Sequence, residues 1–173
     1  MLFRSWASNN KPAPARPAAP IGAVISIPAP MGLPPVPVPA DNPPTAETVA
    51  LGRRLYYDKH LSIDNTVSCA TCHSPSAGFS DGKPVSEGVK GQKGGRNAPT
   101  VFNAAYFTVQ FWDGRAPSLE EQAKGPVQNP IEMSHSHQGI EAYLNSNPQY
   151  VEVFAKAFGP GRVKYDKIGR AHV

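Results

Sequence analysis

The distribution of proline divides this chain into two unequal parts. Twelve of its 20 prolines lie before Thr45, and eight lie from Thr45 to the end. Proline has no amide hydrogen and a fixed φ, so a segment this rich in it is a poor helix or sheet former. We therefore expect residues 1–44 to be a proline-rich extended segment, a disordered tail or linker of polyproline II type. Residues 45–167 have ordinary proline content and the length of one domain.

Charge is balanced over this second part. The whole chain carries a formal charge of +4, but residues 45–167 hold 13 Lys and Arg against 12 Asp and Glu. Proteins that bind nucleic acid gather Lys and Arg on one face, so nucleic acid is not an expected partner. The chain contains no run of 18 apolar residues, and we expect no membrane span.

Two cysteines are the only ones in the chain, and a histidine follows the second directly. They are Cys69, Cys72 and His73 in SCATCH. The spacing Cys-x-x-Cys-His is the attachment signature of c-type haem. On a helix, residues i and i+3 share a face, so two thiols there can add to the two vinyl groups of one porphyrin. The adjacent His73 can then bind the iron from the proximal side.

Three other interpretations use the same residues. A structural zinc site needs four ligands, usually from two Cys or His pairs, and the chain has no second cysteine pair. A thioredoxin-like dithiol requires a surrounding βαβ pattern, whereas turn residues follow Cys72. A disulfide between residues three apart is geometrically awkward and leaves the role of His73 unexplained.

Local signals outline the helices before and at the motif. Thr45, after two prolines, is a predicted N-cap for a helix through about residue 57, with Leu51 and Leu55 on one face. A short helix is expected to carry the cysteine motif. Residues 74–100 are rich in glycine and are expected to form a long loop.

Three further helices are predicted after this loop. Ser118 and Glu121 form a predicted capping box for a short helix closed by Gly125 and Pro126. A second helix covers about residues 139–145, and a third runs from Asn147 to residue 159. No strand ladder is evident, so the predicted fold class is all-α, a cytochrome c-like haem domain. The apolar residues expected around the porphyrin are Leu51, Leu55, Tyr56, Val67, Phe79, Val101, Phe102 and Phe111.

Several longer stretches in residues 43–160 add a family resemblance. In chain order they are ALGRRLYYDKHLS, SCATCHSPSAGFSDG, GGRNAPTVFNAAY and FWDGRAPSLEEQAKGPVQNPIEM. Together with the final helix, they resemble the N-terminal haem domain of the bacterial dihaem cytochrome c peroxidases, a family that includes the MauG-type enzymes. The resemblance implies a periplasmic peroxidase that holds one covalent haem c in this domain and a second haem in another.

The resemblance also implies roles for individual residues. His73 is the proximal ligand of the peroxidatic haem, and Glu132 is the acid/base on its open distal side. Gln122 is expected to line the same pocket, and Trp112 to couple the two haems electronically. Asn97 matches a ligand of a calcium ion held between the two domains.

The expected partners follow from the same family. They are hydrogen peroxide and a small cytochrome c or cupredoxin that donates electrons, and the full-length protein is expected to be a homodimer. A single-haem electron carrier is the main alternative; it needs a second strong axial ligand, for which Met133 is the one methionine in the domain. A MauG-like oxidase that acts on a protein substrate is the third candidate function.

The sequence departs from the family pattern in the glycine-rich loop. Many members place a histidine there, eight residues before the asparagine that aligns with Asn97, and this histidine blocks the distal iron until the partner haem is reduced. The corresponding residue is Val89, which cannot bind iron. We therefore expect an open distal site in the oxidised protein, with Lys90, His135 or His137 as replacement ligands if it is closed.

The end of the chain differs as well. No second Cys-x-x-Cys-His is present, although the family has one in its second haem domain. The last six residues, IGRAHV, match what one reading frame of a common sequencing-library adapter encodes. We expect a truncated fragment whose residues 168–173 are a non-native terminus.

Overall fold

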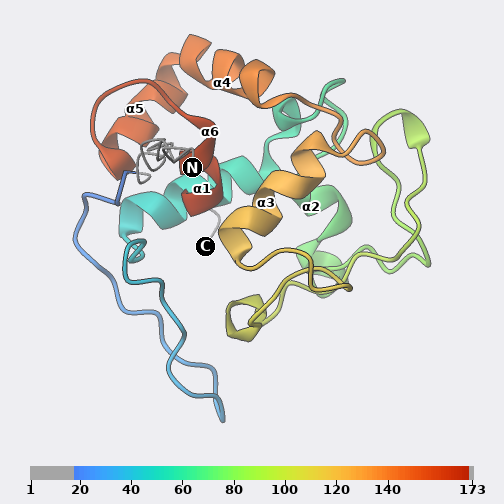
Figure 1. The fold of residues 1–173 in the computed structure, drawn as a ribbon, viewed down its shortest axis with the longest axis horizontal. Helices are drawn as coiled ribbons and strands as arrows, with labels where there is room; N and C mark the ends of the chain where they lie inside the picture. Colours follow the sequence, from blue (N-terminus) through green and yellow to red (C-terminus); the bar gives the residue numbers. More distant parts are fainter. Residues whose placement is uncertain (1–17, 172–173) are drawn as a thin grey trace, which may run out of the picture.

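The computed structural model describes residues 18–171, in which helices surround a single apolar core. The central helix α1 (Ala46–Tyr57) packs against α5 (Pro148–Phe158), α6 (Tyr165–Ala171) and the short α2 (Cys69–Cys72). α3 (Leu119–Gln128) packs on α6, and α4 (His137–Ser146) packs on both α5 and α6. Loops between α2 and α3 occupy the opposite side of the molecule from α4 and α5 (Figure 1). Strand pairing in the described residues is limited to isolated bridges, so the all-α prediction is confirmed.

Short 3-10 turns interrupt the loops. They are η1 (Lys59–Leu61), η2 (Pro75–Ala77), η3 (Val89–Gly91) and η4 (Ala104–Tyr106). No helix in the described part of the chain is both long and apolar enough to cross a bilayer.

The predicted boundaries of α1 are confirmed. The Thr45 hydroxyl accepts a hydrogen bond from the backbone N–H of Thr48, and the Thr48 hydroxyl in turn accepts from the N–H of Thr45. This reciprocal cap satisfies two donors that the first helical turn leaves unpaired. Leu51 and Leu55, one helical turn apart, are 1% and 0% exposed, so the face predicted to be apolar is the face that packs.

The helix after Asn147 is also confirmed. The Asn147 side chain accepts from the N–H of Gln149, Pro148 occupies the first turn, and Gly159 ends the helix with a φ of 82°. Its inward side buries Tyr150, Phe154, Ala157 and Phe158. The helix predicted over 139–145 is present as α4, which begins two residues earlier.

The predicted end of α3 is wrong. Ser118 caps the helix as expected by accepting from the N–H of Glu121, but the helix continues through Gly125 and Pro126 to Gln128. Proline removes one helical hydrogen bond because it lacks an N–H. Beyond it, the N–H of Asn129 still donates to the carbonyl of Gly125 at 3.1 Å. Val127 is buried in the core, which holds this last turn in place.

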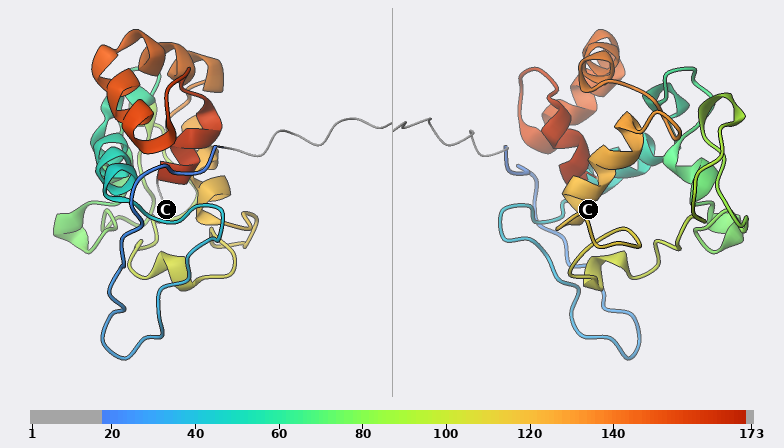
Figure 2. Two further views of the ribbon diagram at one scale, coloured as in Figure 1. Left: turned by 90° about the vertical axis from the view of Figure 1, so that its left-hand side faces the viewer. Right: turned by 45° about the vertical axis from the view of Figure 1, so that its right-hand side comes forward.

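Residues 18–44 form a long loop that projects beyond the helices and returns to the start of α1 (Figure 2), where the N–H of Ile25 donates to the carbonyl of Pro44 at 2.9 Å. The N–H of Ile21 donates to the carbonyl of Ala157 at 3.0 Å, and the Tyr106 hydroxyl donates to the carbonyl of Pro34 at 2.7 Å. Residues 1–17 lie outside the described residues. Residues 18–44 thus contact the domain, and the role of residues 1–44 as a linker stays a prediction. The boundary at residue 45 stays a prediction.

The segment expected to be non-native begins inside α6. Ile168, Gly169, Arg170 and Ala171 are buried, and Arg170 lies within 3.3 Å of the Asp41 carboxylate and 3.9 Å of Glu120. Residues 172–173 lie outside the described residues. The origin of this terminus stays a prediction.

Candidate haem-binding site

The cysteine motif lies on α2, a single helical turn. The N–H of Ser68 donates to the Thr71 hydroxyl at 3.0 Å where the turn begins. The N–H of His73 donates to the carbonyl of Cys69 at 2.9 Å where it ends. This turn therefore places the two thiols three residues apart on one face and sets His73 at its carboxyl end.

Hydrogen bonding fixes which ring nitrogen of His73 is free. Its Nδ1 lies 3.0 Å from the carbonyl oxygen of Pro99 and 3.4 Å from that of Phe79. A carbonyl oxygen can only accept, so Nδ1 carries the hydrogen and Nε2 keeps its lone pair. A metal-binding histidine is usually oriented in this way. His73 is thus prepared to bind iron through Nε2.

The two thiols are not joined in a disulfide. Burial raises the pKa of Cys69 to about 11. Burial also raises the pKa of Cys72, and the nearby negative charges of Asp81 and Glu132 add to the effect. A redox-active dithiol has a lowered thiol pKa. These shifts run in the opposite direction and disfavour a thioredoxin-like role.

Glu132 lies in the turn that follows α3. Its Oε1 accepts a hydrogen bond of 2.6 Å from the side-chain amide of Asn129. One short loop connects its backbone to the cysteine motif: the N–H of Val89 donates to the carbonyl of Glu132 at 2.8 Å, and Sγ of Cys72 lies 4.0 Å from the carbonyl oxygen of Glu87. The neighbouring Met133 is 3% exposed and belongs to the apolar core.

The remaining predicted site residues lie in two places. Gln122 is half-buried in the second turn of α3, where its N–H donates to the carbonyl of Ser118. Trp112 is 60% exposed, and its indole N–H donates to the carbonyl of Asn97 at 3.1 Å. Trp112 and Asn97 are therefore in contact. Within residues 18–171 no group of three or more His, Cys, Asp or Glu side chains could hold a metal ion.

The sequence prediction missed two supports of Glu132. One is Asn129, whose position three residues before Glu132 in NPIE is the only signal. The other is the loop at Gly88 and Val89, where the N–H of Val89 donates to the carbonyl of Glu132 at 2.8 Å. A Cβ on Gly88 would lie 2.5 Å from that same carbonyl oxygen, so glycine is what permits this close approach.

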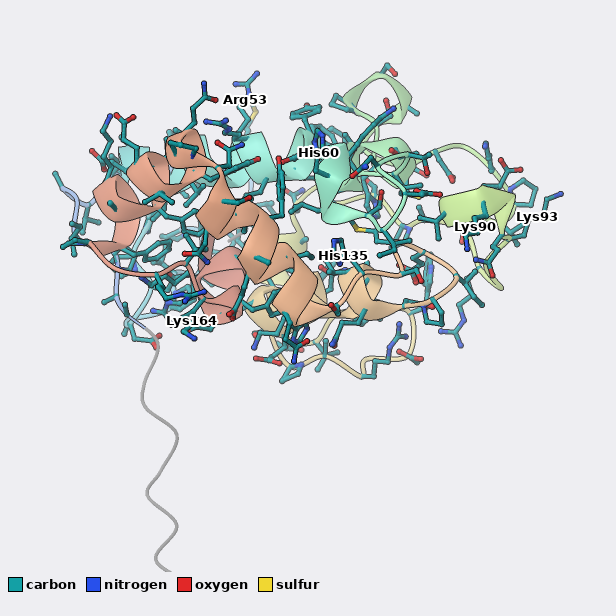
Figure 3. The ribbon with its side chains drawn as sticks, turned by 90° about the horizontal axis from the view of Figure 1, so that it is seen from above. Arg53, His60, Lys90, Lys93, His135 and Lys164 are labelled. Carbon is teal, nitrogen blue, oxygen red and sulfur yellow. The ribbon has the colours of Figure 1, made fainter. Side chains whose placement is uncertain are left out.

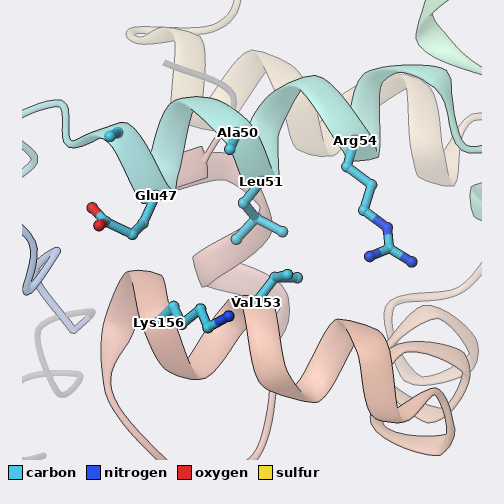
Figure 4. Close-up of a pocket in the computed structure, with 7 residues that line it drawn as sticks. Glu47, Ala50, Leu51, Arg54, Val153 and Lys156 are labelled. Carbon is cyan, nitrogen blue, oxygen red and sulfur yellow. The ribbon is translucent and has the colours of Figure 1, made fainter.

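A groove of about 290 Å³ lies away from this motif, between α1 and α5 (Figure 4). Its walls include Leu51 and Val153, with Glu47, Arg54 and Lys156 at its edges. Leu51 is the one residue expected around the porphyrin that also lines this groove, and Cys69, Cys72, His73, Gln122 and Glu132 are not among its lining residues.

The donor set fits a covalently bound haem c. Two protonated thiols share one helical face, and the following histidine presents a free Nε2. The hydroxyl of Tyr56 donates to the carbonyl of His73 at 2.5 Å and ties the ligand to α1. Cys69 and Cys72 would hold the porphyrin, and His73 would bind its iron.

Comparison with known proteins identifies the family. The family model described as di-haem cytochrome c peroxidase matches residues 46–173. The chain is 52% identical over 108 residues to cytochrome c551 peroxidase of Pseudomonas aeruginosa, covering 62% of this chain and 31% of the relative. It is 44% identical over 138 residues to the methylamine utilization protein MauG of Methylorubrum extorquens, covering 80% of this chain and 38% of the relative.

Solved structures agree with this result. A MauG-like protein associated with microbial copper homeostasis superposes with a TM-score of 0.76 at 36% identity, over 83% of this chain and 43% of that one. The diheme peroxidase BthA of Burkholderia thailandensis superposes with a TM-score of 0.67 at 29% identity, over 76% of this chain and 38% of that one. The chain thus spans about a third to two fifths of the length of these relatives. Its motif, fold and similarity agree: the chain belongs to the di-haem cytochrome c peroxidase family.

Proposed function

We propose that this chain forms the peroxidatic haem domain of a cytochrome c peroxidase, which reduces hydrogen peroxide to water. The observation that supports this most directly is the placement of Glu132. Its carboxylate accepts a hydrogen bond from Asn129, and its backbone is bonded to the loop at Val89, which also approaches Cys72 at Glu87. The neighbouring His73 has its Nε2 free for iron. The site thus combines a proximal ligand with a group that can move a proton.

Haem c bound here would supply an iron that takes up peroxide and passes it electrons. Overall, hydrogen peroxide gains two electrons and two protons and gives two waters. Splitting the O–O bond requires a proton to leave the oxygen that binds and to reach the oxygen that departs as water. Glu132 can accept that proton and return it. Gln122 can donate a hydrogen bond that orients peroxide without adding charge.

The electrons are proposed to come from a small cytochrome c or a cupredoxin through a second haem domain. Trp112, exposed and bonded to Asn97, is proposed to lie on that route. Asn97 is proposed to contribute to a calcium site between the domains. A periplasmic location and a homodimer of the full-length protein complete the proposal.

A MauG-like oxidase that acts on a protein substrate is the second candidate. Similarity to MauG proteins over four fifths of the chain, and to a MauG-like structure, favours it. The two candidates share the same haem site and differ in where the oxidising equivalents go. Oxidation of a small cytochrome c by peroxide in the full-length protein supports the first, and oxidation of a protein substrate supports the second.

The acid/base role is tested with Glu132→Gln in the haem-loaded chain. Rapid mixing of the ferric protein with peroxide, followed by the visible spectrum, measures the reaction without an electron donor. We expect the rate to fall by about 10²–10⁴-fold, the usual contribution of general acid–base catalysis. Glu152→Gln is the matched control, because Glu152 is an exposed carboxylate on α5 paired with Lys156. An unchanged rate in Glu132→Gln would overturn the proposal.

A further inference from the structure

The Asn129 side chain makes two hydrogen bonds of different kinds. Its Oδ1 accepts from the backbone N–H of Ile131 at 3.1 Å, and its Nδ2 donates to Oε1 of Glu132 at 2.6 Å. The first bond closes a turn of the type that Asn commonly forms with the backbone two residues ahead. The second bond has no part in that turn.

The chemistry of the two partners fixes the orientation of this amide. A backbone N–H can only donate, so it must face the oxygen of the amide, and the NH₂ group is left to face Glu132. The flipped amide would place two acceptors together at Glu132 and two donors together at Ile131. Asn129 is therefore held as a donor to the carboxylate.

The backbone around Glu132 is fixed from several directions. The N–H groups of Glu132 and Ser134 both donate to the carbonyl of Asn129, at 3.0 and 2.9 Å, and Met133 donates to the carbonyl of Pro126. From the other side, Val89 donates to the carbonyl of Glu132. With the main chain fixed, the remaining freedom of Glu132 is in its side-chain torsions, which the bond from Asn129 restrains.

We propose that Asn129 is a positioning residue for Glu132. It holds Oε1 in one place so that Oε2 is the oxygen that accepts and returns the proton. The inference rests on the proposed function, because it assigns the orientation of the acid/base named there. Asn129 does not touch the substrate in this proposal, and it acts only through the Glu132 carboxylate.

Asn129→Asp separates the two bonds. An aspartate at this position keeps an oxygen to accept from Ile131, so the turn is retained, but it replaces the donor to Glu132 with an acceptor. N129D also adds a negative charge beside Glu132, so the neutral N129S, in which serine can accept in the same turn and has no amide, is measured with it. If Asn129 has a role only in the turn, N129S behaves as the wild type. If it positions Glu132, the carboxylate is released and both variants are impaired.

The first readout is spectroscopic and independent of activity. Infrared spectra of the haem-loaded chain, labelled with ¹³C-glutamate, contain the carboxylate band of Glu132, which the difference from Glu132→Gln identifies. We expect this band to change frequency in N129D and in N129S, because a carboxylate stretch responds to loss of a donor. Gln92→Leu is the control: Gln92 donates to the carbonyl of Pro130 in the same turn at 3.1 Å but makes no bond to Glu132. The Glu132 band of Gln92→Leu should keep the frequency that it has in the wild type.

The second readout is the reaction of the ferric protein with peroxide. Misplacement of a catalytic group by about 1 Å can reduce a rate on the order of 100-fold, and we expect N129D and N129S to lose between 10-fold and 100-fold while Gln92→Leu loses little. An unmoved band in folded N129S or N129D overturns the inference. Should N129D fail to fold by circular dichroism, N129S alone decides the comparison.

Failure of the inference is distinguishable from failure of the proposed function. If the wild type and Glu132→Gln react with peroxide at the same rate, the acid/base role is wrong, whatever the infrared band does. If Glu132→Gln is slow while N129S keeps both the band and the rate of the wild type, only the role of Asn129 is wrong.

Discussion

The phenol of Tyr56 donates a 2.5 Å hydrogen bond to the backbone carbonyl of His73. Tyr56 lies in the last turn of α1, so this bond joins the central helix directly to the residue that would bind iron. Burial raises the pKa of Tyr56 well above its ordinary value, so the phenol remains a donor throughout the physiological range. The position of the ligand thus depends on a side chain outside the haem motif.

Tyr56→Phe is expected to lower the free energy of unfolding of the haem-loaded chain by about 1 kcal/mol, because it leaves the carbonyl of His73 without its donor. Urea titration followed by circular dichroism measures the change. Tyr57→Phe is the matched control, since Tyr57 is 50% exposed and its ring merely contacts that of Tyr56. Equal midpoints for the two variants would contradict the structural role of this bond.

A second prediction concerns Asp58, the residue that caps the end of α1. Its Oδ2 accepts from Tyr143 at 2.9 Å and from Tyr150 at 2.5 Å. Burial alone would raise the pKa of Asp58, but hydrogen bonds from Tyr150, His60 and Tyr143 outweigh it and lower the pKa below its ordinary value. A carboxyl group with a lowered pKa in the folded state stabilises the fold above its unfolded pKa. This contribution is lost as pH falls through the folded-state pKa.

Tyr150→Phe should therefore weaken the acid dependence of stability. At neutral pH the loss of a hydrogen bond to a charged group costs about 1.5–3 kcal/mol. Between pH 5 and pH 2 the free energy of unfolding of Tyr150→Phe should fall less steeply than that of the wild type. Denaturant titrations at several pH values test this, and parallel curves for the two proteins would refute the role of Tyr150.

Much of the helical framework is predictable from local sequence signals. Caps at Thr45 and Asn147 and the stop at Gly159 depend on neighbouring residues, so short stretches of sequence contain the necessary information. The end of α3 does not follow from local signals. Pro126 and Gly125 indicate a stop, but burial of Val127 among distant residues extends the helix. A tertiary contact here outweighs a local propensity.

The haem site likewise combines features that local sequence predicts with features that depend on distant contacts. The arrangement of Cys69, Cys72 and His73 follows from helical geometry. The placement of Glu132, in contrast, requires the loop at Val89 to meet the loop after α3. Those loops contain Lys90 and Ser134, two non-glycine residues with positive φ, which sequence patterns seldom reveal. Phe102 is 56% exposed and forms a T-shaped pair with Phe79, and the contact of both rings with the porphyrin stays a prediction.

Gly88 provides a test of the contact between these loops. A Cβ at this position would lie 2.5 Å from the Glu132 carbonyl oxygen and 2.7 Å from its Cα, and backbone atoms cannot move aside easily. Gly88→Ala is expected to destabilise the fold by about 1–3 kcal/mol, as overpacking does, and to slow the reaction with peroxide. At Gly95 a Cβ would meet nothing within 4 Å, so Gly95→Ala is the control. Similar thermal unfolding of the two variants would show that the loops do not pack as closely as described.

The distal side of the haem depends on Val89 and on the three residues that could replace it as ligands. Val89 is 1% exposed, and its side chain belongs to the core. Lys90 lies at the outer edge of the loop, whereas His135 lies toward the middle of the molecule (Figure 3). The Nδ1 of His135 accepts from the N–H of Ser136 at 2.9 Å.

The last prediction follows from these positions. In neutral His135 the Nδ1 accepts, so Nε2 carries the hydrogen and has no lone pair for iron, and burial lowers the pKa of this ring, which favours the neutral form. His137 is engaged in stacking on Tyr165. The oxidised haem-loaded chain should therefore show a high-spin ferric visible spectrum and bind cyanide promptly without prior reduction. A low-spin spectrum with slow cyanide binding would mean that one of these side chains moves to the iron, and His135→Ala, His137→Ala and Lys90→Ala would identify which one by restoring the high-spin form.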